Sequence, residues 1–306
     1  MSQFVNTIQP PYLQKGDRVH IVCPSGYLAK EQVKECTETL QRWGFHVTYG
    51  KTVGLGNHYF AGTDTERLQD LQDALNDPSI AAILCGRGGY GMSRIIDALQ
   101  FSQFKKYPKW LIGYSDITLL HNHIYKHTKV ASIHSPMAAA FKDKLAAPYL
   151  EHLRQLLCGE PASISVATNS FNKWGKVTGP LVGGNLAMLA HSIGTNSALS
   201  TQGTIVFFED VDEHLYQIDR MLLQLLRSHF FAEVKGIIVG KFVGAKDTTR
   251  PFGKSLFEIL DEHLGVLAVP VAYDFPISHS VHNYPVKLGI EHVFEVSKTT
   301  VTLTPA

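Results

Sequence analysis

Ser115 lies where the sequence changes from an apolar run to an amphipathic helical pattern. Residues 110–112 form the run, Gly113 follows it, and apolar residues then recur at helical spacing. A serine on such a strand-to-helix turn is exposed at a sheet edge, where free N–H groups of the helix can bind an oxyanion. This layout predicts a nucleophile. The second glycine of G-x-S-x-G is replaced by Ile117, so a helix N-cap is the alternative for Ser115.

A glycine-rich segment, residues 86–91 (GRGGYG), lies between another apolar run and a helical pattern. Its glycines fit the G-x-G-x-x-G pattern of dinucleotide-binding loops. The segment follows the third predicted strand, however, and the first strand-to-helix turn, CPSG at 23–26, lacks that fingerprint. The same small residues can form a backbone nest that binds a carboxylate or an oxyanion. A nucleotide site, a nest and a simple tight turn are therefore all open at this point.

A serine nucleophile needs a base and an acid that orients it. Glu209 and Asp210 end an apolar run, whereas Glu213 begins a helix, where an acidic residue is common. His279 lies in a loop after a later run, a position that suits a proton carrier. The order serine, acid, histidine is that of the α/β hydrolases, although triads occur in several orders.

Histidines are also grouped at His121, His123 and His127, and the last two are one helical turn apart. Such a pair can bind a metal, but no third ligand accompanies it at a recognised spacing, and H-E-x-x-H is absent. We therefore favour a polar helix face with partly buried imidazoles over a metal site.

The elements that must position these residues follow an alternating pattern in the first half of the chain. Short apolar runs separated by helical patterns predict a parallel sheet covered by helices on both faces, with functional residues beyond the carboxyl ends of the strands. The predicted strands are 19–23, 45–49, 80–85, 110–112, 204–208, 236–243 and 267–273, with helices near 213–229 and 254–263 and a terminal β pair within 288–304.

The periodicity weakens between residues 150 and 176, and 306 residues suffice for two domains. We therefore expect an α/β protein with an N-terminal parallel-sheet domain over 1–160, which carries the serine, and a smaller α/β domain over 161–306, which carries the acid and the histidine. A triad drawn from both halves predicts an active site in the cleft between the domains.

Composition excludes several classes of protein. The 28 Lys and Arg residues nearly balance the 27 Asp and Glu residues, which argues against a nucleic-acid binder or an electrostatic membrane binder. The N-terminal residues lack a basic and apolar leader pattern, and no run is long enough to span a bilayer, so we expect a cytoplasmic protein. The four cysteines form no C-x-x-C pair and are interpreted as buried, reduced thiols.

Seven blocks between about residue 16 and residue 289 together resemble the LD-carboxypeptidase family, serine peptidase family S66, which includes the bacterial murein tetrapeptide carboxypeptidases. The blocks are CPSG at 23–26, FAGTD at 60–64 with Arg67 and Asp70, RGGYG at 87–91, GYSDIT at 113–118, GGNL at 183–186, EDV at 209–211 with Tyr216, IDR at 218–220 and Leu222, and SH at 278–279 with Pro285 and Gly289.

The resemblance implies that Ser115 is the nucleophile, Glu209 the acid and His279 the base. One departure is visible, because Ser278 stands where the family usually has glycine before this histidine. Serine disfavours the positive φ that glycine allows, so an altered loop backbone is expected there.

The resemblance also implies that the oxyanion is bound by backbone amides, here those of Asp116 and of Gly88 and Gly89. Arg87, beside these glycines, is a candidate for binding the carboxylate of the substrate, although an exposed salt bridge is an equal alternative for its side chain.

The implied substrate is a murein tetrapeptide cleaved at the L,D bond before its terminal D-alanine during cell-wall recycling, with no metal or organic cofactor. The family also suggests a homodimer. Two alternatives have other substrates or ligands. One is a relative similar to the microcin-immunity peptidases, which cleave a peptidyl or aminoacyl nucleotide, and the other is a nucleotide-binding protein that uses residues 86–91.

Overall fold

The computed structural model describes residues 7–306. The N-terminal segment without a leader pattern begins with residues 1–6, which lie outside the described residues. The chain divides into two compact units. The first contains the residues up to Pro161 together with Tyr284–Gly289, and the second contains Ala162–Asn283 and Ile290–Ala306. The chain thus departs from the single continuous domain expected over 161–306, because residues 284–289 supply a strand to the sheet of the first unit.

The first unit is built on a six-stranded sheet. Its five N-terminal strands are all parallel in the order β2-β1-β3-β4-β5, and β11 pairs antiparallel with β5 at one edge. The predicted parallel sheet is therefore confirmed. Its strands are β1 (Arg18–Val22), β2 (His46–Tyr49), β3 (Ile80–Cys85), β4 (Trp110–Gly113), β5 (Ser132–His134) and β11 (Val286–Leu288).

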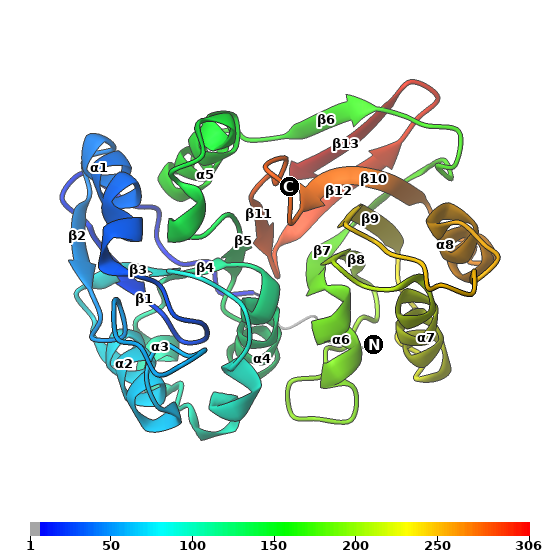
Figure 1. Cartoon of the computed structure of the whole chain (residues 1–306). Coiled ribbons are helices and arrows are strands. Elements are labelled where there is room, and N and C mark those ends of the chain that lie inside the picture. The colour runs from blue at the N-terminus through cyan, green and yellow to red at the C-terminus, as the bar shows by residue number, and fades with distance from the viewer. Residues whose placement is uncertain (1–6) are drawn as a thin grey trace. The chain divides into compact units, whose positions relative to one another are not determined.

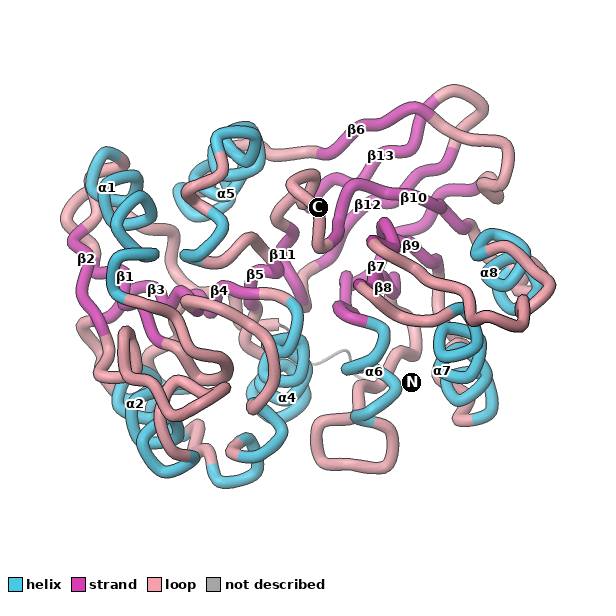
Figure 2. Tube along the Cα trace, viewed as in Figure 1, coloured by secondary structure: helices cyan, strands magenta, loops and turns pink. Residues whose placement is uncertain are grey.

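Helices cover both faces of this sheet. Within the first unit, α1 and α5 lie on one face and α2, α3 and α4 on the other, with the strands between them (Figures 1 and 2). These helices are α1 (Lys34–Arg42), α2 (Asp64–Asn76), α3 (Ser102–Lys106), α4 (Thr118–Thr128) and α5 (Ala147–Cys158). The buried strands of such a sheet are apolar on both sides, which is why they are readable as short runs of sequence.

The start of α2 is fixed by a capping box, and its buried face includes two charged residues. Thr63 and Glu66 form the capping box. Arg67 and Asp70 are buried beside Leu71, whereas Leu68 is only half-buried. Both charges are hydrogen-bonded, since Asp70 accepts bonds from the backbone after β2 and Arg67 donates to two carbonyls. Buried charges need such partners.

The helix expected after the glycine-rich segment is absent. Residues 92–99 instead form two short 3₁₀ turns, Met92–Arg94 and Ile96–Ala98, whose apolar side chains are buried. The apolar pattern located the buried positions but could not distinguish one α-helix from two tighter turns.

The second unit has a seven-stranded sheet in the order β10-β9-β8-β7-β12-β13-β6. The strands β7, β8, β9 and β10 are parallel, and the predicted terminal pair is confirmed as β12 and β13. Its elements are β6 (Ile164–Ala167), β7 (Gly175–Asn185), α6 (Leu186–Ser192), β8 (Ile205–Val211), α7 (Leu215–Arg227), β9 (Gly236–Val243), α8 (Leu256–Leu264), β10 (Val271–Ser278), β12 (Glu291–Val296) and β13 (Thr300–Pro305).

The cysteines agree with the expectation of reduced thiols. All four are free, and Cys23, Cys36 and Cys85 are fully buried while Cys158 is partly exposed. Burial raises the pKa of the Cys23 thiol to about 12, so it is protonated and unreactive at neutral pH. From residue 7 onward, no helix combines the length and the apolar character needed to cross a bilayer.

Gly183 in β7 is required by close packing of two backbones. A Cβ atom at Gly183 would lie 1.9 Å from the Phe207 carbonyl oxygen, whereas a Cβ atom at Gly194 would meet no atom within 4 Å. Both glycines have positive φ, so alanine is strained at either position by about 1–2 kcal/mol. We expect Gly183→Ala to lower the thermal unfolding midpoint much more than Gly194→Ala, because only the former adds a steric clash. Equal losses in the two variants would contradict this explanation.

Candidate functional site

Ser115 has a backbone conformation that non-glycine residues seldom adopt. Its φ is 64°, in the left-handed region, directly after β4 and at the start of the turn that leads into α4. Tyr114 is the N-cap residue of that turn and no side chain caps it, so the N-cap alternative for Ser115 is wrong. Serine at positive φ on a strand-to-helix turn is the geometry of a nucleophile elbow.

A glycine in the next segment brings a second backbone against this serine. A Cβ atom at Gly88 would lie 2.9 Å from Cβ of Ser115 and 3.1 Å from its Oγ, so only glycine allows the approach. Gly89 follows with a φ of 97°. Of the three possibilities for residues 86–91, the nest is the one that this approach favours, because backbone amides of the segment lie beside a candidate nucleophile.

Asp116 has a side-chain role that the sequence did not reveal. Sequence reasoning used only its backbone amide, but its carboxylate is buried and joins the serine turn to two other loops. Asp116 Oδ2 accepts hydrogen bonds from Ser25 Oγ at 2.6 Å and from the Met92 amide at 2.8 Å. A buried carboxylate with such donors holds the turn in place.

In the second unit, the structure brings Glu209 and His279 together. Glu209 lies near the end of β8 with no exposed surface, and His279 directly follows β10. His279 Nδ1 donates a hydrogen bond of 2.5 Å to Glu209 Oε2. An acid bonded to Nδ1 fixes the imidazole tautomer and orientation, as a general base requires.

The contact between Glu209 and His279 depends on a glycine that sequence reasoning missed. Strand β9 lies between β8 and β10, and its Gly240 has no side chain to separate them. A Cβ atom there would lie 2.8 Å from Cβ of Glu209 and 2.2 Å from the Ile277 carbonyl oxygen. A glycine within a predicted central strand is a sequence signal of such a close approach.

The two other candidate acids have different surroundings. Asp210 Oδ1 accepts from Asn185 Nδ2 at 2.8 Å, and its Oδ2 accepts from the Ala187 amide at 2.9 Å. Burial, followed by the charge of Glu209, raises the pKa of Asp210 to about 7. Glu213 precedes α7 and lies two residues before its start. Glu209 is therefore the acid that the geometry assigns to His279.

The electrostatics of His279 reflect two opposed effects. Burial disfavours the charged imidazolium, but the hydrogen bond and the charge of Glu209 outweigh burial and raise the pKa of His279 above its usual 6.5. The charges of Asp210 and Asp212 also raise the pKa of His279. The pair thus stabilises a proton on His279, which is the state that a general base reaches after it accepts a proton.

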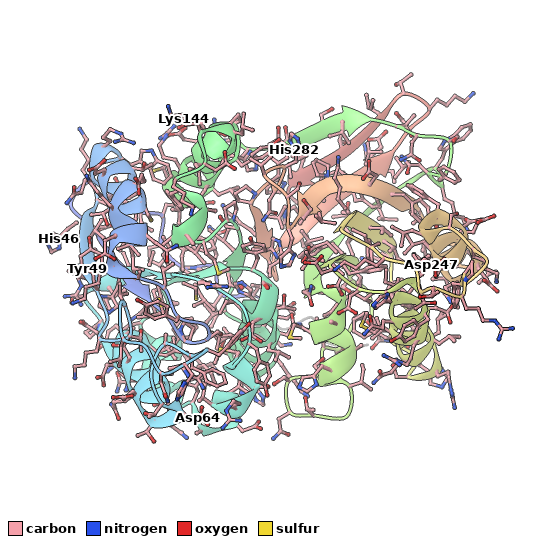
Figure 3. The ribbon with its side chains drawn as sticks, viewed as in Figure 1. His46, Tyr49, Asp64, Lys144, Asp247 and His282 are labelled. Carbon is pink, nitrogen blue, oxygen red and sulfur yellow. The ribbon has the colours of Figure 1, made fainter. Side chains whose placement is uncertain are left out.

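Ser278 does not distort the loop in the way its replacement of glycine led us to expect. It lies at the end of β10 and is absent from the residues with positive φ. Its hydroxyl donates to the His282 carbonyl at 3.0 Å and accepts from the Ser280 amide at 3.0 Å. His282, labelled in Figure 3, thus belongs to a turn that is bonded back to the residue before His279.

Arg87, the candidate for binding a carboxylate, is exposed. It donates a hydrogen bond of 3.2 Å to the Tyr27 carbonyl, and no salt bridge of this side chain is found in residues 7–306. The guanidinium keeps donors that can reach a ligand. Its role stays a prediction.

The histidines of α4 form ring contacts within the helix and bonds to the neighbouring strands. His121 bonds Ser132 Oγ at 2.8 Å and the Gly113 carbonyl at 2.9 Å, and the rings of His123 and His127 lie 4.2 Å apart. In the part of the chain that the structure describes, no three His, Cys, Asp or Glu side chains are grouped so as to hold a metal ion. Burial lowers the pKa of His121 to about 4, so it is neutral at pH 7.

Comparisons with known proteins identify the family to which the chain is similar. The model of the LD-carboxypeptidase N-terminal domain matches residues 19–135, and that of the C-terminal domain matches residues 178–293. The chain is 31% identical to the murein tetrapeptide carboxypeptidase of Pseudomonas aeruginosa, over 91% of this chain and 93% of that protein. It also resembles the crystal structure of the muramoyltetrapeptide carboxypeptidase from Oxalobacter formigenes, with a TM-score of 0.87, 27% identity and coverage of 94% and 98%. The microcin C7 self-immunity protein MccF, solved with aspartyl sulfamoyl adenosine, has the same fold at a TM-score of 0.86, 24% identity and coverage of 98% and 99%.

The opposed effects on His279 can be separated by substitution. In Glu209→Gln the charge is removed while burial persists, so we expect the pKa of His279 to fall from above 6.5 to below it. Titration of the imidazole signals by NMR, assigned with His279→Ala, measures this change. Glu213→Gln is the matched control and should leave the His279 titration unchanged. A wild-type pKa below 6.5 would contradict the dominance of Glu209.

Proposed function

Because the chain belongs to the LD-carboxypeptidase family, we propose that it is a serine carboxypeptidase that releases the C-terminal D-alanine of murein tetrapeptides. The observation that carries this proposal is the 2.5 Å hydrogen bond between buried Glu209 and His279, since an oriented imidazole is the base that a serine nucleophile needs. The names of the Pseudomonas and Oxalobacter relatives supply the substrate class. The bond to be cleaved joins the L-centre of the diamino acid to D-alanine.

Acylation begins with proton transfer from Ser115. Neutral His279 accepts the hydroxyl proton as Oγ attacks the scissile carbonyl carbon, and Glu209 stabilises the resulting imidazolium. The carbonyl oxygen becomes an oxyanion that accepts hydrogen bonds from the Asp116 amide and from the amides of Gly88 and Gly89.

Collapse of the tetrahedral intermediate breaks the C–N bond. His279 gives its proton to the departing nitrogen, D-alanine leaves with a neutral amine, and Ser115 keeps the acyl group as an ester. Water then loses a proton to His279 as it attacks the ester, and the second intermediate collapses to release the tripeptide and regenerate the serine. Neither half-reaction needs a redox partner or a group outside the protein and water.

Arg87 is the side chain that we assign to the terminal carboxylate of D-alanine. Its exposed guanidinium lies beside the glycine nest and offers paired N–H donors. Such a pair matches the two oxygens of a carboxylate better than the ammonium group of a lysine does. A carboxypeptidase must recognise that group, because a free C-terminus is what distinguishes its substrate from an internal peptide bond.

We also propose a cytoplasmic homodimer, on the resemblance to the family. Sedimentation velocity at micromolar concentration tests the assembly, and a single species with the 33.9 kDa mass of one chain would contradict the dimer. Fractionation of the producing cell tests the compartment.

Removal of the nucleophile should abolish turnover and preserve the fold. We expect Ser115→Ala to release D-alanine about 10⁴- to 10⁶-fold more slowly than the wild type, as for other catalytic serines. Mass spectrometry of L-Ala-γ-D-Glu-meso-diaminopimelate-D-Ala after incubation measures the product, with a chelator present in a parallel sample. Exposed Ser102→Ala is the matched control and should retain wild-type activity. Normal activity of folded Ser115→Ala would refute the assigned nucleophile.

The raised pKa of His279 sets the acid side of the pH profile. His279 must be neutral to accept the serine proton, so kcat/KM falls as the pH drops through the pKa of this imidazole in the free enzyme. Because that pKa is raised, we expect the half-maximal point to lie above 6.5. An acid limb centred below 6.5, measured with the same tetrapeptide, would contradict the assignment of His279 as the base.

A second substrate separates the two activities represented among the similar structures. The same assay with an aminoacyl adenylate analogue that carries a cleavable amide tests the alternative of a microcin-immunity-like peptidase. We expect a higher kcat/KM for the murein tetrapeptide. The reverse preference would move the assignment to nucleotide-bearing substrates and leave the Ser115 mechanism in place.

A further inference from the structure

Three consecutive residues after β1, Pro24, Ser25 and Gly26, are hydrogen-bonded to Arg67, Asp116 and Gly88, respectively. They lie at the carboxyl end of β1, and Ser115 and the glycine-rich segment follow the carboxyl ends of β4 and β3 in the same parallel sheet. We propose that residues 24–26 are a positioning element that fixes the oxyanion-binding amide of Gly89 relative to Ser115. This inference rests on the proposed serine mechanism and assigns a role to residues that do not themselves react.

The bond from Gly26 controls the direction of a peptide plane. The Gly26 amide donates a hydrogen bond of 3.0 Å to the Gly88 carbonyl oxygen. In a planar trans peptide the carbonyl of one residue and the N–H of the next point in opposite directions. Fixing the Gly88 carbonyl on Gly26 therefore fixes the direction of the Gly89 N–H, which points away from Gly26.

The bond from Ser25 joins the same loop to the serine turn. Ser25 is fully buried, and its hydroxyl donates to Asp116 Oδ2 at 2.6 Å. The same carboxylate oxygen accepts from the Met92 amide, just after the glycine-rich segment. One buried anion, adjacent to Ser115 in sequence, thus connects the turn, the loop after β1 and the end of the segment that carries Gly89.

The bond to Pro24 comes from a buried cation. Arg67 has no exposed surface, and its Nη1 donates to the Pro24 carbonyl at 2.5 Å and to the Gly91 carbonyl at 3.0 Å. Asp64 at the start of α2, labelled in Figure 3, pairs with Nη2 of the same guanidinium. Arg67 therefore joins Pro24 to Gly91, and Asp116 joins Ser25 to Met92. Two oppositely charged side chains thus connect the loop after β1 to the end of the glycine-rich segment.

Such rigidity matters because oxyanion donors act only when they are in place before the charge develops. Removal of one donor in a serine hydrolase costs about 10²–10³ in kcat, since the interaction is made in the transition state and hardly at all with the bound substrate. A displacement of the Gly89 amide should therefore lower kcat while KM stays near its wild-type value.

Gly26 allows a direct test of this role. A Cβ atom at Gly26 would lie 2.8 Å from the Gly88 carbonyl oxygen, closer than normal contact, while its φ is outside the left-handed region. Alanine at this position is thus acceptable for the local backbone but must displace Gly88. Gly56 is the matched control, because its φ is also outside that region and an added Cβ would make only ordinary contacts of 3.4 Å with Tyr27.

The experiment compares wild type, Gly26→Ala, Ser25→Ala and Gly56→Ala in D-alanine release from the tetrapeptide. We expect kcat to fall about 10²-fold in Gly26→Ala and about tenfold in Ser25→Ala, with KM within about twofold of wild type, and no change in Gly56→Ala. Hydrogen exchange followed by mass spectrometry should show faster exchange over residues 86–92 in the first two variants only. If Gly26→Ala does not fold, the kcat and the hydrogen exchange of Ser25→Ala are compared with those of wild type and Gly56→Ala.

The outcomes separate this inference from the proposed function. Wild-type kcat in folded Gly26→Ala and Ser25→Ala, or a raised KM at unchanged kcat, would overturn the positioning role. A wild type that releases no D-alanine would refute the proposed substrate. In that case faster exchange over 86–92 in Gly26→Ala and not in Gly56→Ala would still support the positioning role, and unchanged exchange would overturn it.

Discussion

The left-handed backbone at Ser115 is the constraint on which the first unit depends. A non-glycine residue pays about 1–2 kcal/mol for a positive φ, so the surroundings must impose this conformation. Buried strand β4 fixes the chain before the turn, and the carboxylate of Asp116 fixes it afterwards through Ser25 and Met92. The serine is consequently presented by a turn that cannot relax without breaking buried hydrogen bonds.

Three glycines are needed for the backbone and side-chain contacts of the candidate site. Gly88 lets one backbone reach Ser115, and Gly240 lets Glu209 reach across a strand to the segment that carries His279. Gly113 leaves room for Ile117, the residue that replaces the second glycine of the hydrolase pattern. These positions share one physical requirement, a close approach that any Cβ atom would prevent.

Much of the fold could be predicted because the buried parallel strands and amphipathic helices of the first unit have simple apolar patterns. Strand β7 was not predicted because four glycines and Pro180 lower its strand propensity, and β10 begins later than its apolar run. Helix α5 was not predicted because most of it lies in the segment interpreted as the domain boundary. The burial of Arg67 and Asp116 could not be read from sequence, since charged residues are normally exposed unless the tertiary structure supplies partners.

The choice between Glu209 and Asp210 shows why a site needs three-dimensional information even where its residue types are evident. The two adjacent acids lie near the end of β8, where its pairing with β9 is irregular, and they meet different neighbours. Asp210 meets Asn185 and the amide of Ala187, and its burial favours the neutral form. Glu209 meets His279, whose proton it stabilises. The same carboxyl chemistry therefore serves to hold the start of α6 at one position and to orient a base at the next.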